Sequence, residues 1–523
     1  MPKKRRIFLL SVIIIVGLFF AFACRTRSSS NSNAVTVVTS DPFSGLDTLS
    51  NVSTDAAADR LRTLMFNSLV KKNDKFEYVG DLAKDVKISD DNLTVTFTLQ
   101  DNVKFHNGKI LTSTDAKYTI DAMLQSNGYK GGNFYDTVDG QRQPHIVSMD
   151  TPDARTFVVK VARPALVNQL LSNLVTVPII PEGTIEQQKT APVGTGAFKF
   201  VRFDAVNNMV ELAANQDYWE GAPQIKNLIV KTITDSNALQ AELQAGRVDV
   251  VPNPTNFSAE TFKLLGQNPN LQVVQTDGSN VRYIGYNVQN KPVSNVKLRQ
   301  AIAYAVDRDK IINDLLGGEA KIAYSILPDS SWAYAPGTKY NFDPAKARQL
   351  LQESGYKGET IKFKIAAGNQ SISQYSQIIQ NNLKAVGINV EIEPLENNTL
   401  LADLAKGQFE MNTSQWVGGN QDPIFLRDLF DSDYTPEKNK AGRNRARYSN
   451  PEFDKIVEEA VNTVDKAKAR ALYAEAQDIV SRDLPLFPLW YPSNMVVASK
   501  RVGNVKINAS GDWSFIKDLT VAG

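Results

Sequence analysis

The sequence predicts a mixed α/β protein, built from sheets that are covered by helices. Segments with apolar residues at helical spacing alternate along the chain with segments whose apolar and polar residues alternate, as in strands. This order is typical of layered α/β domains. The chain has 523 residues, which is more than one hydrophobic core usually serves, so two or three domains are expected.

Five segments predict strands, each because β-branched and apolar residues recur at every second position. The clearest is 93–99 (LTVTFTL), which alternates strictly. The segment 208–213 (NMVELA) has weaker strand character and runs into a turn-rich stretch. The predicted strands are 35–39, 93–99, 208–213, 361–365 and 388–392.

Five segments predict helices, and the strongest pattern is the apolar stripe of 296–316. The order helix, glycine, strand occurs twice, from 345 to 365 and from 373 to 392, which favours a sheet with helices on its faces. The predicted helices are 55–69, 112–122, 296–316, 345–353 and 373–386. The residues expected at their ends are Thr112 or Ser113, Asp343 with Pro344, Gly317 with Gly318, Gly355 and Gly387.

The first 24 residues have the pattern of an export signal. Four basic residues at 3–6 precede an apolar run that ends at Ala23 and Cys24, the only cysteine of the chain. This pattern resembles a bacterial lipoprotein signal, in which the cysteine takes a diacylglycerol and becomes the first residue. The alternative is an uncleaved anchor, because about 18 apolar residues can just cross a bilayer. Residues 25–33 would form a flexible tether.

Charge and cysteine content exclude several classes of protein. Loss of residues 1–23 would leave 54 Lys and Arg against 56 Asp and Glu, so nothing attracts nucleic acid. A single cysteine permits no internal disulfide.

The residue patterns of common enzymes are absent from the sequence. The only two histidines, His106 and His145, cannot make a three-histidine metal site, and no HExxH, GxSxG or GxxxxGK[ST] spacing occurs. His106 is expected to be a structural residue. A glycosidase with paired carboxylates stays open, because no spacing marks or excludes such a pair.

Six segments together resemble the extracytoplasmic solute-binding proteins of the peptide, oligopeptide and nickel family, which deliver ligands to ABC importers. Most of the motifs favour structural roles: Gly194-Thr195-Gly196 predicts a tight turn, and Tyr218 and Trp219 predict packing of a loop against a sheet. Arg299 and Asp307 are expected to anchor neighbouring loops. The six segments are 64–70 (LMFNSLV), 93–118, 192–203 (PVGTGAFKFVRF), 215–235, 243–251 and 295–311.

The resemblance implies a two-lobed, periplasmic-binding-protein-like clamp with an extra inserted subdomain, which encloses its ligand as the lobes close. The chain would cross between lobes near Tyr286-Asn287 and near Pro488 to Tyr491. The expected segments are a signal peptide at 1–23, a tether at 24–33, lobe 1 at 34–76, an inserted subdomain at 77–172, lobe 1 again at 173–286, lobe 2 at 287–487 and a return to lobe 1 at 488–523.

The resemblance also places a candidate pocket. In peptide-binding members a loop reads Trp-x-x-Asp-x-x-Asp/Glu-Pro, and its first Asp binds the peptide amine. Here that loop begins at Trp416, and Gly419 stands at the position of the amine-binding Asp. Asp422 could replace it, although Asp422 before a proline is also typical of a helix cap. The expected ligand-binding residues are Ser40, Asp41, Trp416, Gly418, Gly419, Asn420, Asp422, Trp490 and Tyr491.

The expected partners are an oligopeptide or peptide-like solute, the permease subunits of an ABC importer, and the outer face of the cytoplasmic membrane through a lipid on Cys24. The chain is expected to be a monomer without cofactor, metal or catalysis. Oligosaccharide binding, an exported hydrolase and a signalling receptor remain alternatives. Nickel and haem are disfavoured because both histidines fall in the predicted subdomain.

Overall fold

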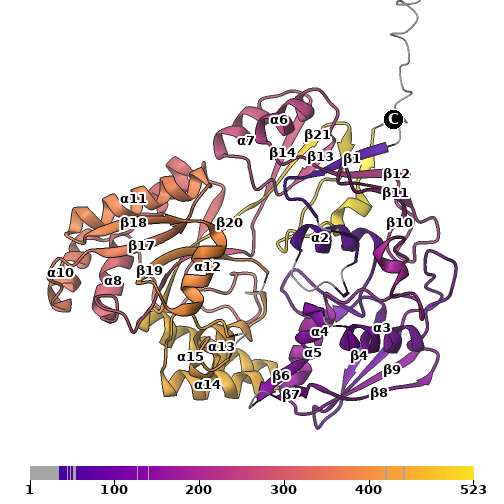
Figure 1. Ribbon diagram of the computed structural model, residues 1–523, viewed down its shortest axis with the longest axis horizontal. Coiled ribbons are helices and arrows are strands. Elements are labelled where there is room, and N and C mark those ends of the chain that lie inside the picture. Colours follow the sequence, from indigo (N-terminus) through magenta and orange to yellow (C-terminus); the bar gives the residue numbers. More distant parts are fainter. Residues whose placement is uncertain are drawn as a thin grey trace, which may run out of the picture.

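The computed structural model describes residues 34–522 except 44, 48, 51–54, 127, 139–140, 419–420 and 440–441. The proposed signal peptide, Cys24 and the tether therefore lie outside the described residues, as do Gly419 and Asn420. Figure 1 shows two parts, each built on a sheet with helices against it. No helix of the described ranges is both long enough and apolar enough to pass through a bilayer.

The first large sheet has seven strands and belongs to what we call lobe 1. The apolar side chains of its central strand divide between two cores: Val35 and Val37 face helix α2 (Ala56–Met65), whereas Val38 faces α6 (Ser236–Gln244) and α7 (Ala259–Gly266). In spatial order the strands are β10 (Phe198–Asp204), β11 (Met209–Ala214), β12 (Asn227–Thr232), β1 (Ala34–Thr39), β13 (Val250–Pro252), β21 (Asn494–Ser499) and β14 (Leu271–Thr276).

The second large sheet has six strands and belongs to lobe 2. Alternate residues of one strand again face different cores: Val281 faces α13 (Phe425–Phe430), α14 (Pro451–Asn462) and α15 (Lys466–Asp483), and Ile284 faces α8, α10 and α11. The strands in spatial order are β16 (Ala320–Ile322), β20 (Leu486–Pro492), β15 (Val281–Tyr286), β19 (Met411–Trp416), β17 (Ile361–Ala366) and β18 (Val390–Leu395). The remaining helices are α8 (Val296–Ala305), α10 (Pro344–Ser354), α11 (Gln370–Val386) and α12 (Asn397–Lys406).

Two short links join the sheets, and they correct the expected crossing points. The chain passes from β14 to β15 at residues 277–280, and from β20 back to β21 at Ser493. The expected crossings near Tyr286-Asn287 and at Pro488 to Tyr491 fall at the end of β15 and inside β20, which are both strands of lobe 2.

A smaller four-stranded antiparallel sheet lies within the segment 77–172, which the sequence analysis assigned to an inserted subdomain. Val95 and Phe97 of its β5 belong to the same buried core as Val35 of lobe 1, so this segment packs directly on the first lobe. Its elements are β4 (Ala83–Ile88), β5 (Thr94–Leu99), α3 (Ser113–Gln125), α4 (Tyr129–Gly132), β6 (Tyr135–Val138), β7 (Gln141–Pro144), β8 (Ile146–Asp153), β9 (Thr156–Val161) and α5 (Leu166–Leu174). The hairpin before this four-stranded sheet consists of β2 (Val70–Lys72) and β3 (Tyr78–Gly80).

All five predicted strands and four of the five predicted helices are present, with ends shifted by a few residues. The prediction of one helix over 296–316 is wrong. α8 ends at Ala305, and the chain continues as α9 (Arg308–Lys310) and a π-helical turn (Ile311–Leu315). Asp307 causes the break, because its side chain accepts the Lys310 amide at 2.9 Å and so begins a new helix inside the apolar stripe.

Candidate solute-binding site

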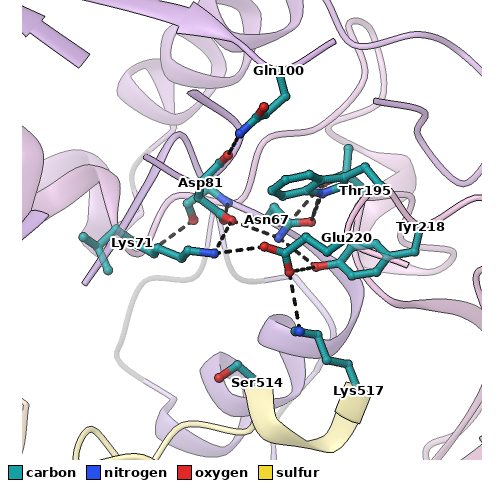
Figure 2. Close-up of polar contacts among 12 residues, drawn as sticks. Asn67, Lys71, Asp81, Gln100, Thr195, Tyr218, Glu220, Ser514 and Lys517 are labelled. Atoms are coloured by element: carbon teal, nitrogen blue, oxygen red, sulfur yellow. Dashed lines mark hydrogen bonds and ion pairs between the residues drawn. The ribbon is translucent and has the colours of Figure 1, made fainter. Parts of the chain in front are cut away.

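Three of the family-like motifs meet in a polar network of lobe 1 (Figure 2). Asn67 lies at its centre: the Thr195 hydroxyl donates to its amide oxygen at 3.1 Å, and the indole Nε1 of Trp219 donates to the same oxygen at 3.3 Å. The Asn67 amide nitrogen donates to the Tyr218 hydroxyl at 3.4 Å. These contacts assign the motifs around residues 67, 195 and 218 to the structure of lobe 1.

The carboxylates of this network are already paired with lysines. Asp81 and Glu220 lie 3.5 and 3.0 Å from Lys71, and Lys517 lies 3.6 Å from Glu220 (Figure 2). Burial raises the pKa of Asp81, and Lys71 opposes that rise. The network therefore joins the C-terminal segment to the hairpin. Both of these carboxylates are paired with a lysine, so neither is free for acid–base chemistry.

His106 is held by the glycine turn at residues 194–196. Its Nε2–H donates to the Gly196 carbonyl at 3.0 Å, and the Gly194 amide donates to its Nδ1 at 3.3 Å. Both ring nitrogens are thus satisfied in the neutral imidazole. Burial lowers the pKa of His106 from 6.5 to about 4.

This shift predicts a pH dependence of stability. The unfolded chain takes up the His106 proton below pH 6.5 and the folded chain only near pH 4, so stability is complete above 6.5 and falls between these values. The loss reaches at most about 3 kcal/mol. Urea unfolding near neutral pH and near pH 5 measures it, and His106→Gln should show a flatter dependence over this range. An unchanged slope in the variant would assign the dependence to other groups.

The candidate residues Ser40 and Asp41 lie directly after β1 and pair within lobe 1. The Ser40 hydroxyl lies 3.0 Å from that of Thr255, which donates to Asp41 at 3.0 Å. Arg60 lies 3.4 Å from Asp41, whose side chain is 42% exposed. A ligand role for this pair stays a prediction.

The candidates Trp490 and Tyr491 are buried in lobe 2. Trp490 packs edge-on against Tyr375 at a centroid distance of 5.2 Å. The Tyr491 hydroxyl donates to the carbonyls of Ser325 and Leu327 at 2.7 and 2.6 Å. These contacts favour the packing role that the sequence left as the alternative to ligand binding.

Trp416, the last residue of β19, forms the wall of a cavity in lobe 2. Its ring stacks on Tyr283 of β15 at 6.0 Å with an interplanar angle of 12°, and it meets Phe425 edge-on at 5.0 Å. The guanidinium of Arg445 lies over the same indole, 5.7 Å from its centroid. The cavity is small, with a volume of about 30 Å³, and is lined by Tyr283, Gly285, Tyr286, Leu404, Phe409, Asn412, Trp416, Leu429, Phe430, Arg443, Arg445, Ala446, Pro485 and Leu486.

The loop after Trp416 returns toward lobe 1. Gly418 has a φ of +73° and its amide donates to Asn280 at 3.2 Å. Its φ favours glycine, and apart from its two chain neighbours no residue has an atom within 4 Å of where a side chain would begin. Gly419 and Asn420 lie outside the described residues, so their expected contacts stay predictions.

Asp422 is buried and faces lobe 1. One carboxylate oxygen accepts the Ile424 amide at 3.0 Å, and the other accepts the Tyr78 hydroxyl from β3. Burial raises the pKa of Asp422, and the nearby Lys72 ammonium opposes that rise. The sequence offered two roles for Asp422, an amine ligand and a helix cap. Neither role includes its contact with Tyr78, which joins the two lobes. The bond to the Ile424 amide is what the helix-cap interpretation expected, although Ile424, and not Asp422, is the residue directly before α13.

Comparison with known proteins agrees with this geometry. A family model described as "Bacterial extracellular solute-binding proteins, family 5 Middle" matches residues 77–438. The chain belongs to this family. Oligopeptide-binding protein AppA of Bacillus subtilis is 27% identical to it over 548 residues, covering 98% of this chain and 97% of AppA. Heme-binding protein A of Haemophilus influenzae is 28% identical over 509 residues, covering 91% and 90% of the two chains.

Solved structures have a fold similar to that of this chain. The structure of Bacillus subtilis AppA in complex with a nonapeptide has a TM-score of 0.73 and 24% identity, covering 94% of this chain and 99% of that chain. This likeness confirms the expected α/β solute-binding-protein fold. The two relatives described above are named as binding proteins.

The lobes of this family 5 protein contact one another through the hairpin β2–β3. Besides the Tyr78–Asp422 bond, Lys72 donates to Gln421 at 3.4 Å, and Glu77 pairs with Lys466 of α15. Sequence analysis missed this contact, because the hairpin and the loop are about 350 residues apart. It also missed Tyr283, whose place beside Trp416 depends on how β15 pairs with β19, and Arg445, which comes from the segment before α14.

Proposed function

We propose that this protein is the substrate-binding component of an ABC importer, which captures oligopeptides outside the cytoplasmic membrane as its lobes close. The proposal includes a lipid anchor at Cys24 and no catalysis by the chain itself. Oligopeptide-binding protein AppA supports the ligand class by its name and by the nonapeptide in its structure.

One observation carries the ligand class. β19 pairs with β15 along its whole length, but on its other side it pairs with β17 only at Met411 and Asn412. Among the described strands, residues 413–416 therefore have one backbone edge without a neighbour. An extended peptide can add to such an edge through main-chain hydrogen bonds, which tolerate many side chains. The half-buried Trp416 ring beside this edge, backed by the buried Tyr283, could contact the peptide.

Native mass spectrometry of the protein as purified tests the proposal. We expect a ladder of masses from retained mixed peptides, together with a more compact scattering curve when peptide is bound than when it is absent. Retained hexose masses would instead indicate oligosaccharides. Turnover of added peptides or glycans would contradict the proposal in favour of a hydrolase. Identical scattering curves with and without bound peptide would contradict lobe closure.

A further inference from the structure

The cavity beside Trp416 contains an arginine that has no counter-charge among the residues that the structure describes. Arg445 is half-buried, lines this cavity, and stacks over the indole of Trp416. Within the described part of the chain, its guanidinium has neither a carboxylate partner nor a hydrogen-bond acceptor. A cation over an indole gains about 1 kcal/mol. The five N–H donors of the guanidinium point outward in its own plane, so the indole accepts none of them.

The other arginines near the cavity are neutralised. Arg443 lies 3.5 Å from Asp428, and Arg427 lies 3.4 Å from Asp428 and 3.8 Å from Glu458. These two arginines and two carboxylates balance. Arg445 therefore adds one uncompensated positive charge to the cavity wall.

Asp422, the acid of the loop after Trp416, forms no ion pair with Arg445 among the described residues. Asp422 is held by the Tyr78 hydroxyl and the Ile424 amide, and the ammonium that opposes its pKa rise is that of Lys72. A second donor beside Arg445 is also without a partner, because the buried Nε1–H of Trp416 has no acceptor among the described residues. The cavity thus presents donors and positive charge, and it would repel an ammonium group.

We propose that Arg445 binds a carboxylate of the captured solute. A guanidinium and a carboxylate match in plane and can form two parallel hydrogen bonds, which are about twice as strong as neutral ones. The pair would form beside Trp416, where water is partly excluded. This inference rests on the proposed function and adds to it the charge of the ligand. In an oligopeptide the carboxylate comes from the C-terminus or from an Asp or Glu side chain.

Random hexapeptide libraries distinguish these two sources. The purified full chain is incubated with four libraries: one with free termini, one amidated at the C-terminus, one without Asp and Glu, and one with both changes. Retained peptides are quantified by mass spectrometry. We expect retention to fall about tenfold or more when both carboxylate sources are removed. Loss on amidation alone assigns the terminus, and loss on removal of Asp and Glu alone assigns the side chain.

Substitution of Arg445 assigns the effect to this residue. In Arg445→Gln, retention of carboxylate-bearing peptides should fall to the level of the library that lacks both sources. Arg445→Lys keeps the charge without the planar fork and should lie between the two. Arg470→Gln is the control, because Arg470 is exposed on α15. It does not line the cavity, and it makes no ion pair among the described residues. Thermal unfolding of each variant verifies that it is folded.

The outcomes separate this inference from the proposed function. If the wild type retains all four libraries equally, or if Arg445→Gln still discriminates among them, the carboxylate assignment is wrong while peptide capture stands. If no library is retained, the proposed function fails and the inference fails with it.

Discussion

Gly196→Ala is expected to destabilise lobe 1 by more than about 3 kcal/mol. A side-chain carbon at Gly196 would lie 2.3 Å from the carbonyl carbon of Met65 and 2.5 Å from the amide nitrogen of Phe66. Both atoms belong to the backbone at the end of α2, so no side-chain rotation relieves the contact. The Gly196 amide also donates to the Met65 carbonyl at 2.9 Å, and the turn would have to give up this bond to move away.

The same displacement would disturb two neighbours of the turn. The Gly196 carbonyl accepts from His106 at 3.0 Å and from Asn215 at 3.0 Å, and both bonds lengthen if the turn shifts. Urea unfolding followed by circular dichroism measures the loss. Gly132→Ala is the matched control, because no atom of another part of the chain lies within 4 Å of the added carbon. A loss below about 1 kcal/mol in Gly196→Ala would show that the end of α2 adjusts, against this account of the motif.

Asp422→Ala is expected to shift the ligand-free protein toward an open arrangement of its lobes. The variant removes the acceptor of the Tyr78 hydroxyl and leaves the half-buried Lys72 without its nearby counter-charge. Burial already lowers the pKa of Lys72, and only Asp422 opposes that effect. Loss of one partner from such a buried charged contact costs about 2 kcal/mol or more, which is about thirtyfold in the closure equilibrium.

Distances between spin labels measure this shift. Cys24 is the only cysteine of the chain, so Cys24→Ser with introduced cysteines at the exposed Lys87 of lobe 1 and Lys384 of lobe 2 gives one labelled pair. We expect longer distances in Asp422→Ala. Asp433→Ala is the control, since Asp433 is 79% exposed and its ion pair with Lys438 should contribute little. Equal distance distributions in wild type and Asp422→Ala would contradict a role of this carboxylate in holding the lobes together.

Local elements could be predicted from the sequence because their causes lie within a few residues. Thr112 and Asp115 form a capping box that begins α3, and Asp343 caps α10, which ends at Gly355 with a φ of +70°. The wrong prediction of one helix over 296–316 also has a local cause. The apolar stripe continues through the break at Asp307, so periodicity alone could not detect a side chain that begins a new helix.

The candidate site was predicted only in part. Trp416 was found because its loop resembles that of peptide-binding relatives, and the structure places it at a cavity wall. Tyr283 reaches the same wall through the pairing of β15 with β19, across 133 residues of sequence. Trp490 and Tyr491 were expected at the site, but the structure buries them in lobe 2. Aromatic residues near a crossing are equally consistent with a core and with a pocket until their burial is known.

The sequence by itself determined the α/β class, most of the helices and strands, and membership in a family of solute-binding proteins. These follow from short-range patterns and from motifs, which mark the rigid turns and networks of lobe 1. Only the tertiary structure decided where the chain crosses between sheets, that Asp422 contacts Tyr78 of the other lobe, and that Arg445 lies over Trp416 without an ion-pair partner among the described residues. The physical reason is distance along the chain: contacts between residues far apart in sequence depend on strand pairing and lobe packing, and neither has a local signal.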